Sequence, residues 1–216
     1  FLMLRNILLL LALCVIPLFG MTQGNADPYI KEADRHFAQM AYARAIDGYL
    51  AATELGAVNE HVTKRLAECY MRLGRSDKAE KWYEMVVKFL NREPREMYNY
   101  AEDLKSNGKY VEAEEWMDRY LAATAPEGAP RRSNLNGFAR KFLATQDRFI
   151  VRPVSVNTPF SDFGTAWLGA DHVVFSSARH VTTGIERRAA WNDQPFLDLF
   201  VAEVTPNGDL INAHPL

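Results

Sequence analysis

A period of 34 residues runs through the first part of the chain and constrains its fold more than any other feature. Three windows, 26–59, 60–93 and 94–127, align without a gap, and two positions hold alanine in every window. These alanines are Ala33, Ala67 and Ala101 at position 8, and Ala45, Ala79 and Ala113 at position 20. A repeat of this length predicts one supersecondary unit per window, which buries its apolar face by stacking on its neighbours.

Each window is expected to form a pair of antiparallel helices. Alanine at positions 8 and 20 lets the two helices approach closely, because a larger side chain at the crossing would push their backbones apart. Aromatic side chains at positions 17 and 24, such as Tyr42, Tyr49 and Tyr83, would fill the wider space beside the crossing. Gly74 and Gly108, both at position 15, stand where the end of a helix commonly needs a left-handed residue.

Residues 26–127 resemble the tetratricopeptide repeat family in their period, their small-residue columns and their central aromatic. The departures are Glu32 where the family prefers leucine, Met40 where it prefers glycine, and Ser76 where it prefers an aromatic. The resemblance implies a solenoid with a concave groove. Such an array is either a structural spacer or a site for a protein partner, and the residues that line its groove are left open.

Residues 1–25 resemble a secretory signal peptide. Arg5 precedes an apolar run over 7–19, and small and polar residues follow it. The run is shorter than the roughly 20 residues that span a bilayer, so cleavage between Gly20 and Ala26 is expected. Cys14 lies inside this segment and leaves lipidation open as an alternative. The other cysteine, Cys69, is expected to be a small buried side chain on a helix.

The pattern of residues changes after the repeats, from helical to strand-like. Residues 128–146 predict a linker and then a helix over 134–146 that would cap the open end of the third repeat. From residue 147, short runs of Val, Ile and Phe alternate with turn-forming residues, as is typical of β-strands. The strands are expected at 149–156, 165–168, 172–176 and 197–204, with turns at 161–164, 169–171 and 207–209.

Residues 147–216 resemble the first blade of the WD40-like β-propeller that follows helical repeats in cell-envelope proteins of Bacteroidota. The most specific pieces are Phe175-Ser176-Ser177-x-Arg179 and Trp191-x-x-Gln194-Pro195-Phe196-Leu197-Asp198-Leu199. The resemblance implies an α+β multidomain chain, with an α-solenoid of about three helix pairs, a capping helix and an incomplete propeller. It also implies an OmpA-type peptidoglycan-binding domain that is missing here. A propeller needs several blades, so the chain is expected to be truncated.

No catalytic, cofactor-binding or metal-binding residues are predicted. Phosphate-binding loops, nucleophile elbows and zinc-binding motifs do not occur in the sequence. Ser176 and Ser177 precede His180 but lack an acidic partner. The histidines have no second ligand at a metal-binding spacing. They are His36, His61, His172, His180 and His214.

These observations favour a non-catalytic, exported scaffold at the periplasmic face of the outer membrane, with protein partners in the helical groove. Contact with peptidoglycan would require the missing domain, association with the outer membrane would be indirect, and a role in type IX secretion is left open. The net charge of −2 and the dispersed basic residues disfavour nucleic acid. Two alternatives remain, a propeller-gated peptidase whose catalytic domain is missing and a free periplasmic scaffold. Arg179 and Asp198 are candidates for a surface ion pair, and Trp191 is expected to be a packing residue.

Overall fold

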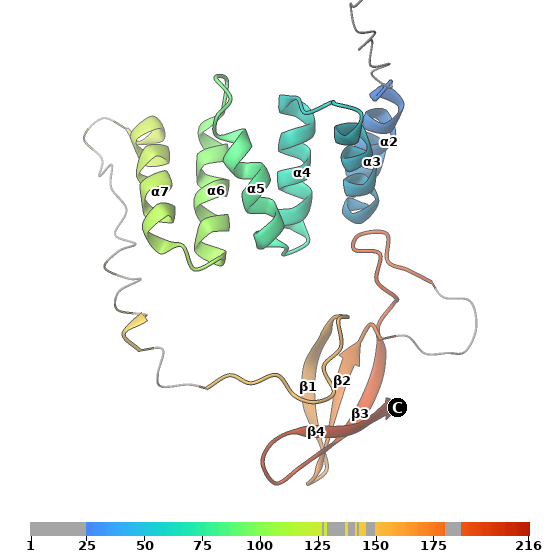
Figure 1. Cartoon of the computed structure of the whole chain (residues 1–216). Coiled ribbons are helices and arrows are strands. Elements are labelled where there is room, and N and C mark those ends of the chain that lie inside the picture. The colour runs from blue at the N-terminus through green and yellow to red at the C-terminus, as the bar shows by residue number, and fades with distance from the viewer. Residues whose placement is uncertain are drawn as a thin grey trace, which may run out of the picture.

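The fold consists of three helix pairs followed by a four-stranded sheet, seen in a computed structural model that describes residues 25–126, 128, 137, 141, 143–145, 150–179 and 187–216. Figure 1 shows the helices side by side in chain order. The helices are α2 (Asp27–Ala38), α3 (Tyr42–Glu54), α4 (Glu60–Arg72), α5 (Ser76–Val86), α6 (Pro94–Ser106) and α7 (Tyr110–Thr124). The strands are β1 (Asp162–Leu168), β2 (His172–Ser177), β3 (Asp198–Val204) and β4 (Leu210–Pro215). Among these described residues, no helix has the length and apolarity to cross a bilayer.

The alanine columns are buried, as the period predicts. All six alanines are at most 1% exposed. A continuous apolar core runs from Ala33 on α2 to Ala113 on α7 and includes Tyr49 and Tyr83. Tyr100 connects the second pair to the third, since its ring lies 6.4 Å from that of Tyr83. The three helix pairs therefore form one tetratricopeptide-like solenoid, and the prediction of that arrangement is confirmed.

The first pair packs more tightly than its alanines alone require. A methyl group added at Gly48 would lie 2.9 Å from the Cβ atom of Ala33 and 3.3 Å from the carbonyl oxygen of Tyr29. The same window position holds Trp82 and Trp116 in the other two pairs, and both indoles pack against the core. The backbones of α2 and α3 thus meet at a position where the other pairs carry a large ring.

Each pair turns from its first helix to its second through the same backbone motif. In every turn an N–H donates to the carbonyl oxygen five residues earlier at 2.9 Å: Ala41 to His36, Arg75 to Tyr70 and Lys109 to Leu104. This Schellman pattern places a left-handed residue just before the donor. Gly74 and Gly108 have φ of 68° and 75°, which confirms their predicted role, and Met40 adopts φ of 58° without being glycine.

The sheet is a meander in which every strand pairs antiparallel with the next, in the order β1-β2-β3-β4. Gly169 and Gly208 have φ of 74° and 81° in the two predicted turns that precede β2 and β4. On the buried face, Phe175 of β2 lies opposite Phe200 of β3. Val173 and Ala202 complete that small apolar cluster.

Two predictions for the β region are wrong. Residues 150–156 form no strand, because Pro153 has no N–H to donate and the N–H of Ser155 donates to the Asp209 carboxylate at 2.7 Å. Most of the stretch expected as a turn at 161–164 lies inside β1. There Gly164, with φ of 70°, sits at a shift of register that marks a β-bulge.

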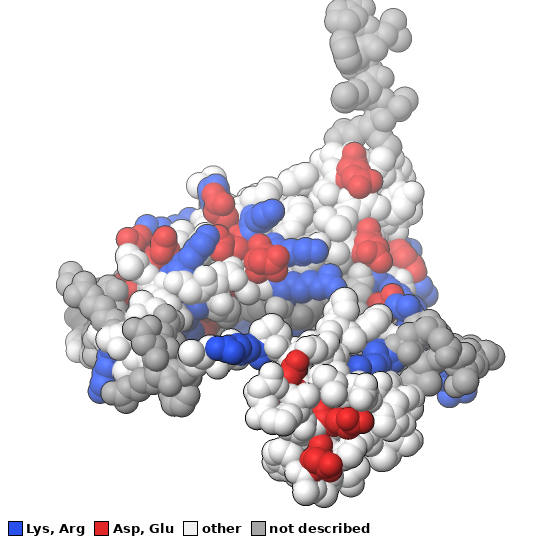
Figure 2. All heavy atoms as spheres, turned by 60° about the horizontal axis from the view of Figure 1, so that its bottom comes forward, with Lys and Arg blue, Asp and Glu red and all other residues white. Residues whose placement is uncertain are grey.

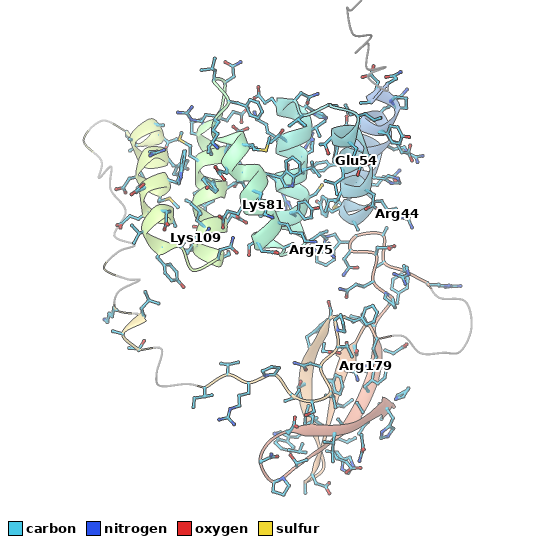
Figure 3. The ribbon with its side chains drawn as sticks, viewed as in Figure 1. Arg44, Glu54, Arg75, Lys81, Lys109 and Arg179 are labelled. Carbon is cyan, nitrogen blue, oxygen red and sulfur yellow. The ribbon has the colours of Figure 1, made fainter. Side chains whose placement is uncertain are left out.

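The predicted pair between Arg179 and Asp198 is also wrong. The start of β1 places Asp162 opposite Ser177, within reach of Arg179, and the guanidinium donates to the Asp162 carboxylate at 3.0 Å. The same guanidinium lies 4.8 Å from the ring centroid of Phe200, so it covers the apolar cluster. Figure 3 shows Arg179 on the sheet. Arg179 is therefore a structural residue of the sheet.

Several predicted features fall outside the described residues. These are residues 1–24 of the signal peptide predicted over 1–25, most of the capping helix over 134–146, and His180. Trp191 is described, and its side chain is 50% exposed, so it is not a fully buried packing residue.

Replacing Met40 by glycine is expected to stabilise the protein by up to about 1 kcal/mol, because a left-handed conformation costs any residue with a Cβ atom roughly that much. Met40 is 64% exposed, so little packing is lost with its side chain. Urea-induced unfolding measures the effect. Gly74→Ala, at the same position of the second pair, is the matched control and should destabilise the protein. A loss of stability in Met40→Gly would contradict the strain argument.

Candidate functional site

A cavity of about 330 Å³ lies between α4 and α6. Most of its lining side chains are charged or polar, and α5 contributes Tyr83 and Val86. The lining residues are His61, Lys64, Arg65, Glu68, Met71 and Arg72 from α4, the two from α5, and Glu93, Arg95, Glu96 and Asn99 from the start of α6. The first helices of the second and third pairs therefore form its two walls.

The helix starts fix where these side chains lie. The side chain of Asn59 accepts a hydrogen bond from the N–H of Val62 at 3.0 Å, so α4 begins directly after Asn59. Helix α6 begins at Pro94, with Glu93 and Glu96 forming a reciprocal capping box. The helical spacing of residues 61, 64, 65, 68 and 72 then places them along one face of α4.

Lys64 joins the two walls. Its ammonium group lies 2.6 Å from the Glu60 carboxylate on its own helix and 2.6 Å from the Glu96 carboxylate on α6. Partial burial on its own would lower the pKa of Lys64, but the hydrogen bonds to the two glutamates outweigh it and raise the pKa. The ammonium group stays charged and engaged, so it holds the walls at a fixed separation.

Arg95 differs from the other cations that line the cavity. Arg65 stacks over the Phe37 ring at 4.0 Å, Arg72 pairs with Glu68 at 3.3 Å, and Lys64 bridges its two glutamates. Arg95 is exposed and, within the described part of the chain, makes no ion pair or ring contact. It is the lining cation whose hydrogen-bond donors are available to a ligand.

A second cavity, of about 250 Å³, lies next to Arg95 and is also lined by Tyr98 and Tyr120. The two tyrosine rings are 5.3 Å apart and tilted by 57°. Tyr98 is 40% exposed, so part of an aromatic face remains open beside the cation. Arg95 thus lies between a polar cavity and an aromatic one.

The α4 wall of the polar cavity is held against the first pair by a network of three side chains from three helices. Asp34 of α2 accepts a hydrogen bond from the Tyr49 hydroxyl of α3 at 2.5 Å, and its carboxylate lies 2.8 Å from His61 Nε2 of α4. Burial and then the Asp34 carboxylate raise the pKa of Tyr49. Tyr49 therefore stays a neutral donor, and the network fixes the first pair against the second.

The residues considered from the sequence do not come together. His36 pairs with Glu32, and His61 with Asp34, while His172 pairs with the adjacent Asp171 and His214 contacts the backbone of Asn212. Across the described residues, no cluster of three or more His, Cys, Asp and Glu side chains is arranged to hold a metal ion. Cys69 is fully buried, as predicted, and burial raises the pKa of its thiol to about 12.

Sequence reasoning missed Arg95, Tyr98 and Asn99. They occupy positions 2, 5 and 6 of the third window, and His61, Lys64 and Arg65 occupy the same positions of the second. Positions 2, 5, 6 and 9 recur at helical spacing and form a helix face distinct from that of the alanine at position 8. This face lines the two cavities, here together called the groove, so the aligned windows already indicated its residues.

No known protein family and no characterised protein matches the sequence. The structure is similar to the Sgt2 TPR domain from Aspergillus fumigatus, with 17% identity and a TM-score of 0.41 over 62% of this chain and 89% of that chain. It is also similar to the first TPR of Spaghetti (RPAP3) bound to an HSP90 peptide, with 20% identity and a TM-score of 0.43 over 55% of this chain and 93% of that chain. A third similar structure is the Yersinia enterocolitica type III secretion chaperone SycD in complex with a peptide of the translocator YopD. Its identity is 18% and its TM-score 0.41, over 56% of this chain and 89% of that chain. These values describe a likeness of fold alone.

One buried acid lies away from the cavity. Asp103 of α6 is 2% exposed, and neither of its carboxylate oxygens has a hydrogen-bond partner among the described residues. Burial, and then the carboxylates of Glu80 and Asp77, raise the pKa of Asp103 to about 7. Nearby Lys109 opposes this shift, but it is paired with Glu80 at 2.5 Å.

Stability is expected to fall as the pH rises towards 7, because folded Asp103 keeps a proton that the unfolded chain loses near pH 4. Asp103→Asn cannot ionise, so this part of the pH dependence should disappear. The variant should be about 1–3 kcal/mol more stable than the parent at pH 8. Urea unfolding at several pH values between 4 and 8 measures it, with Asp47→Asn, a change at an exposed aspartate, as the control. Parallel pH curves for the parent and Asp103→Asn would refute the assignment.

Proposed function

We propose that this chain is a non-catalytic interaction protein whose groove between α4 and α6 binds a segment of another protein. The observation that carries the proposal is the exposed and unpaired Arg95 between its two cavities. A guanidinium group holds a carboxylate through two parallel hydrogen bonds, so an acidic residue of the partner fits here. Tyr98 and Tyr120 offer an open ring face to an apolar side chain next to that acid.

An extended segment fits this groove better than a compact small molecule. The two cavities share Arg95, so a ligand that fills both must pass over the guanidinium and change from polar to aromatic surroundings. Successive side chains of an extended peptide meet such different surroundings in turn. Most of the groove is already organised by Lys64 and the Asp34 network, so little ordering accompanies binding.

The same proposal assigns the sheet to a second interaction surface. Its meander order and its two left-handed glycine turns are compatible with one blade of a propeller. Figure 2 shows few charged side chains on the visible face of the sheet, whereas the helical part carries acids and bases side by side. The blade-like sheet and the signal-like residues 1–25 together support the proposal of an exported protein of the cell envelope. Peptidoglycan attachment belongs to the same proposal and depends on a further domain, and a role in type IX secretion is left open.

Cell fractionation tests the location. An envelope scaffold should be recovered outside the cytoplasm, and an attached one should sediment with cell-wall sacculi. Recovery of the full-length protein in the cytoplasm would refute the proposed location, and soluble periplasmic protein would refute the attachment.

Arg95→Ala is expected to weaken binding of selected acidic peptides about tenfold, because a hydrogen-bonded charge pair contributes roughly that factor. The peptides come from a phage-displayed random library selected on the full chain, and calorimetry measures their affinity. Arg75→Ala is the matched control, since Arg75 is exposed at the start of α5 and does not line the groove. Equal losses in both variants, or selected peptides without acidic residues, would contradict the proposed site.

A further inference from the structure

The turn formed by residues 189–193, here called the Trp191 turn, contacts the first helix pair. The backbone N–H of Ala43 donates to the carbonyl oxygen of Trp191 at 3.2 Å, and Figure 1 shows the chain between β2 and β3 reaching the foot of α3. Ala43 is the second residue of α3, whose N-cap residue Ala41 provides no side-chain cap. The first N–H groups of a helix have no partner within it, so the Trp191 carbonyl takes the place of the missing cap.

The Trp191 turn is held in shape by its own hydrogen bonds. The N–H of Ala189 donates to the Gln194 carbonyl oxygen at 2.8 Å, and the N–H of Asp193 donates to the Ala189 carbonyl oxygen at 2.9 Å. The Arg188 guanidinium donates to the Asp193 carbonyl oxygen at 2.7 Å. At its base, the Gln194 side chain accepts a hydrogen bond from the N–H of Ser161, next to β1, at 3.1 Å. The turn is therefore a rigid extension of the sheet.

The first pair offers room for this contact that the other pairs do not. Ala41 stands at window position 16, where the second and third pairs carry Arg75 and Lys109. Figure 3 shows both of these long side chains at the same end of the solenoid as Arg44. Ala41 is 3% exposed, whereas Arg75 and Lys109 are exposed. A small residue at this position leaves the start of α3 open to an approaching backbone.

We propose that the Trp191 turn is a latch that docks the sheet on the first helix pair through the start of α3. The latch favours one orientation of the sheet relative to the helices. It also assigns a purpose to the Trp191-x-x-Gln194-Pro195 stretch, in which Gln194 holds the turn to the sheet and the Trp191 backbone holds it to the helices.

Ala43→Pro tests the latch, because proline removes the donating N–H while remaining acceptable in the first turn of a helix. Helix α2 already carries Pro28 at this same second position. Val111→Pro, at the second position of α7, is the matched control. Spin labels at Glu54→Cys and Ala166→Cys, in the full chain with Cys14→Ser, report the distance between helices and sheet by pulsed electron paramagnetic resonance. The buried Cys69 thiol is not accessible to the label.

The parent and Val111→Pro should give a distance distribution dominated by one narrow peak, with a minor separated population. Ala43→Pro should raise the separated population roughly fivefold, the factor expected for the loss of one hydrogen bond. Ala41→Arg places the second pair's residue at the docking point and should also raise the separated population. This variant replaces Ala43→Pro in the test if the proline variant loses helical circular dichroism. A broad distribution in the parent would overturn the latch, as would unchanged narrow distributions in the folded variants.

Discussion

The close approach of paired helices at small residues is the constraint on which the rest of the structure depends. The buried alanines set the distance within each pair, and the 34-residue period repeats that distance along the solenoid. The walls of the groove are consecutive first helices, so their separation follows from this packing. Lys64 can reach Glu96 at 2.6 Å because the packing has already brought α4 and α6 to that separation.

The sequence predicted those parts of the fold that depend on local patterns. The alanine columns are visible once the three windows are aligned, and the glycine turns and the hairpin turn at Gly208 are each visible within a few residues. The parts that it did not predict depend on distant partners. Ser155 bonds to Asp209, which is 54 positions away, and this bond replaces the expected strand. The groove was foreseen as a surface, but the free state of Arg95 becomes visible only when the partners of its neighbouring cations are known.

Several charged side chains of this molecule serve its internal organisation. Arg179 covers an apolar cluster, and Lys64 and Arg72 are engaged with carboxylates. A groove with many charged residues thus presents few available charges to a ligand. Selectivity in such a site comes from one unengaged group and from the shape that the engaged groups maintain. Counting the basic residues that line the groove would therefore overestimate the positive charge available to a ligand.

The meeting of Gly48 with Ala33 has a consequence for how the array can change during evolution. Repeat proteins commonly lengthen or shorten by copying whole units, which requires that one unit can stand in for another. Here the first pair leaves no space for a side chain where the other two carry Trp82 and Trp116. A copy of the first unit placed in the interior would omit an indole that packs against the core, and a side chain added at Gly48 would drive α2 from α3. The three units therefore share a period, but the first is not interchangeable with the other two.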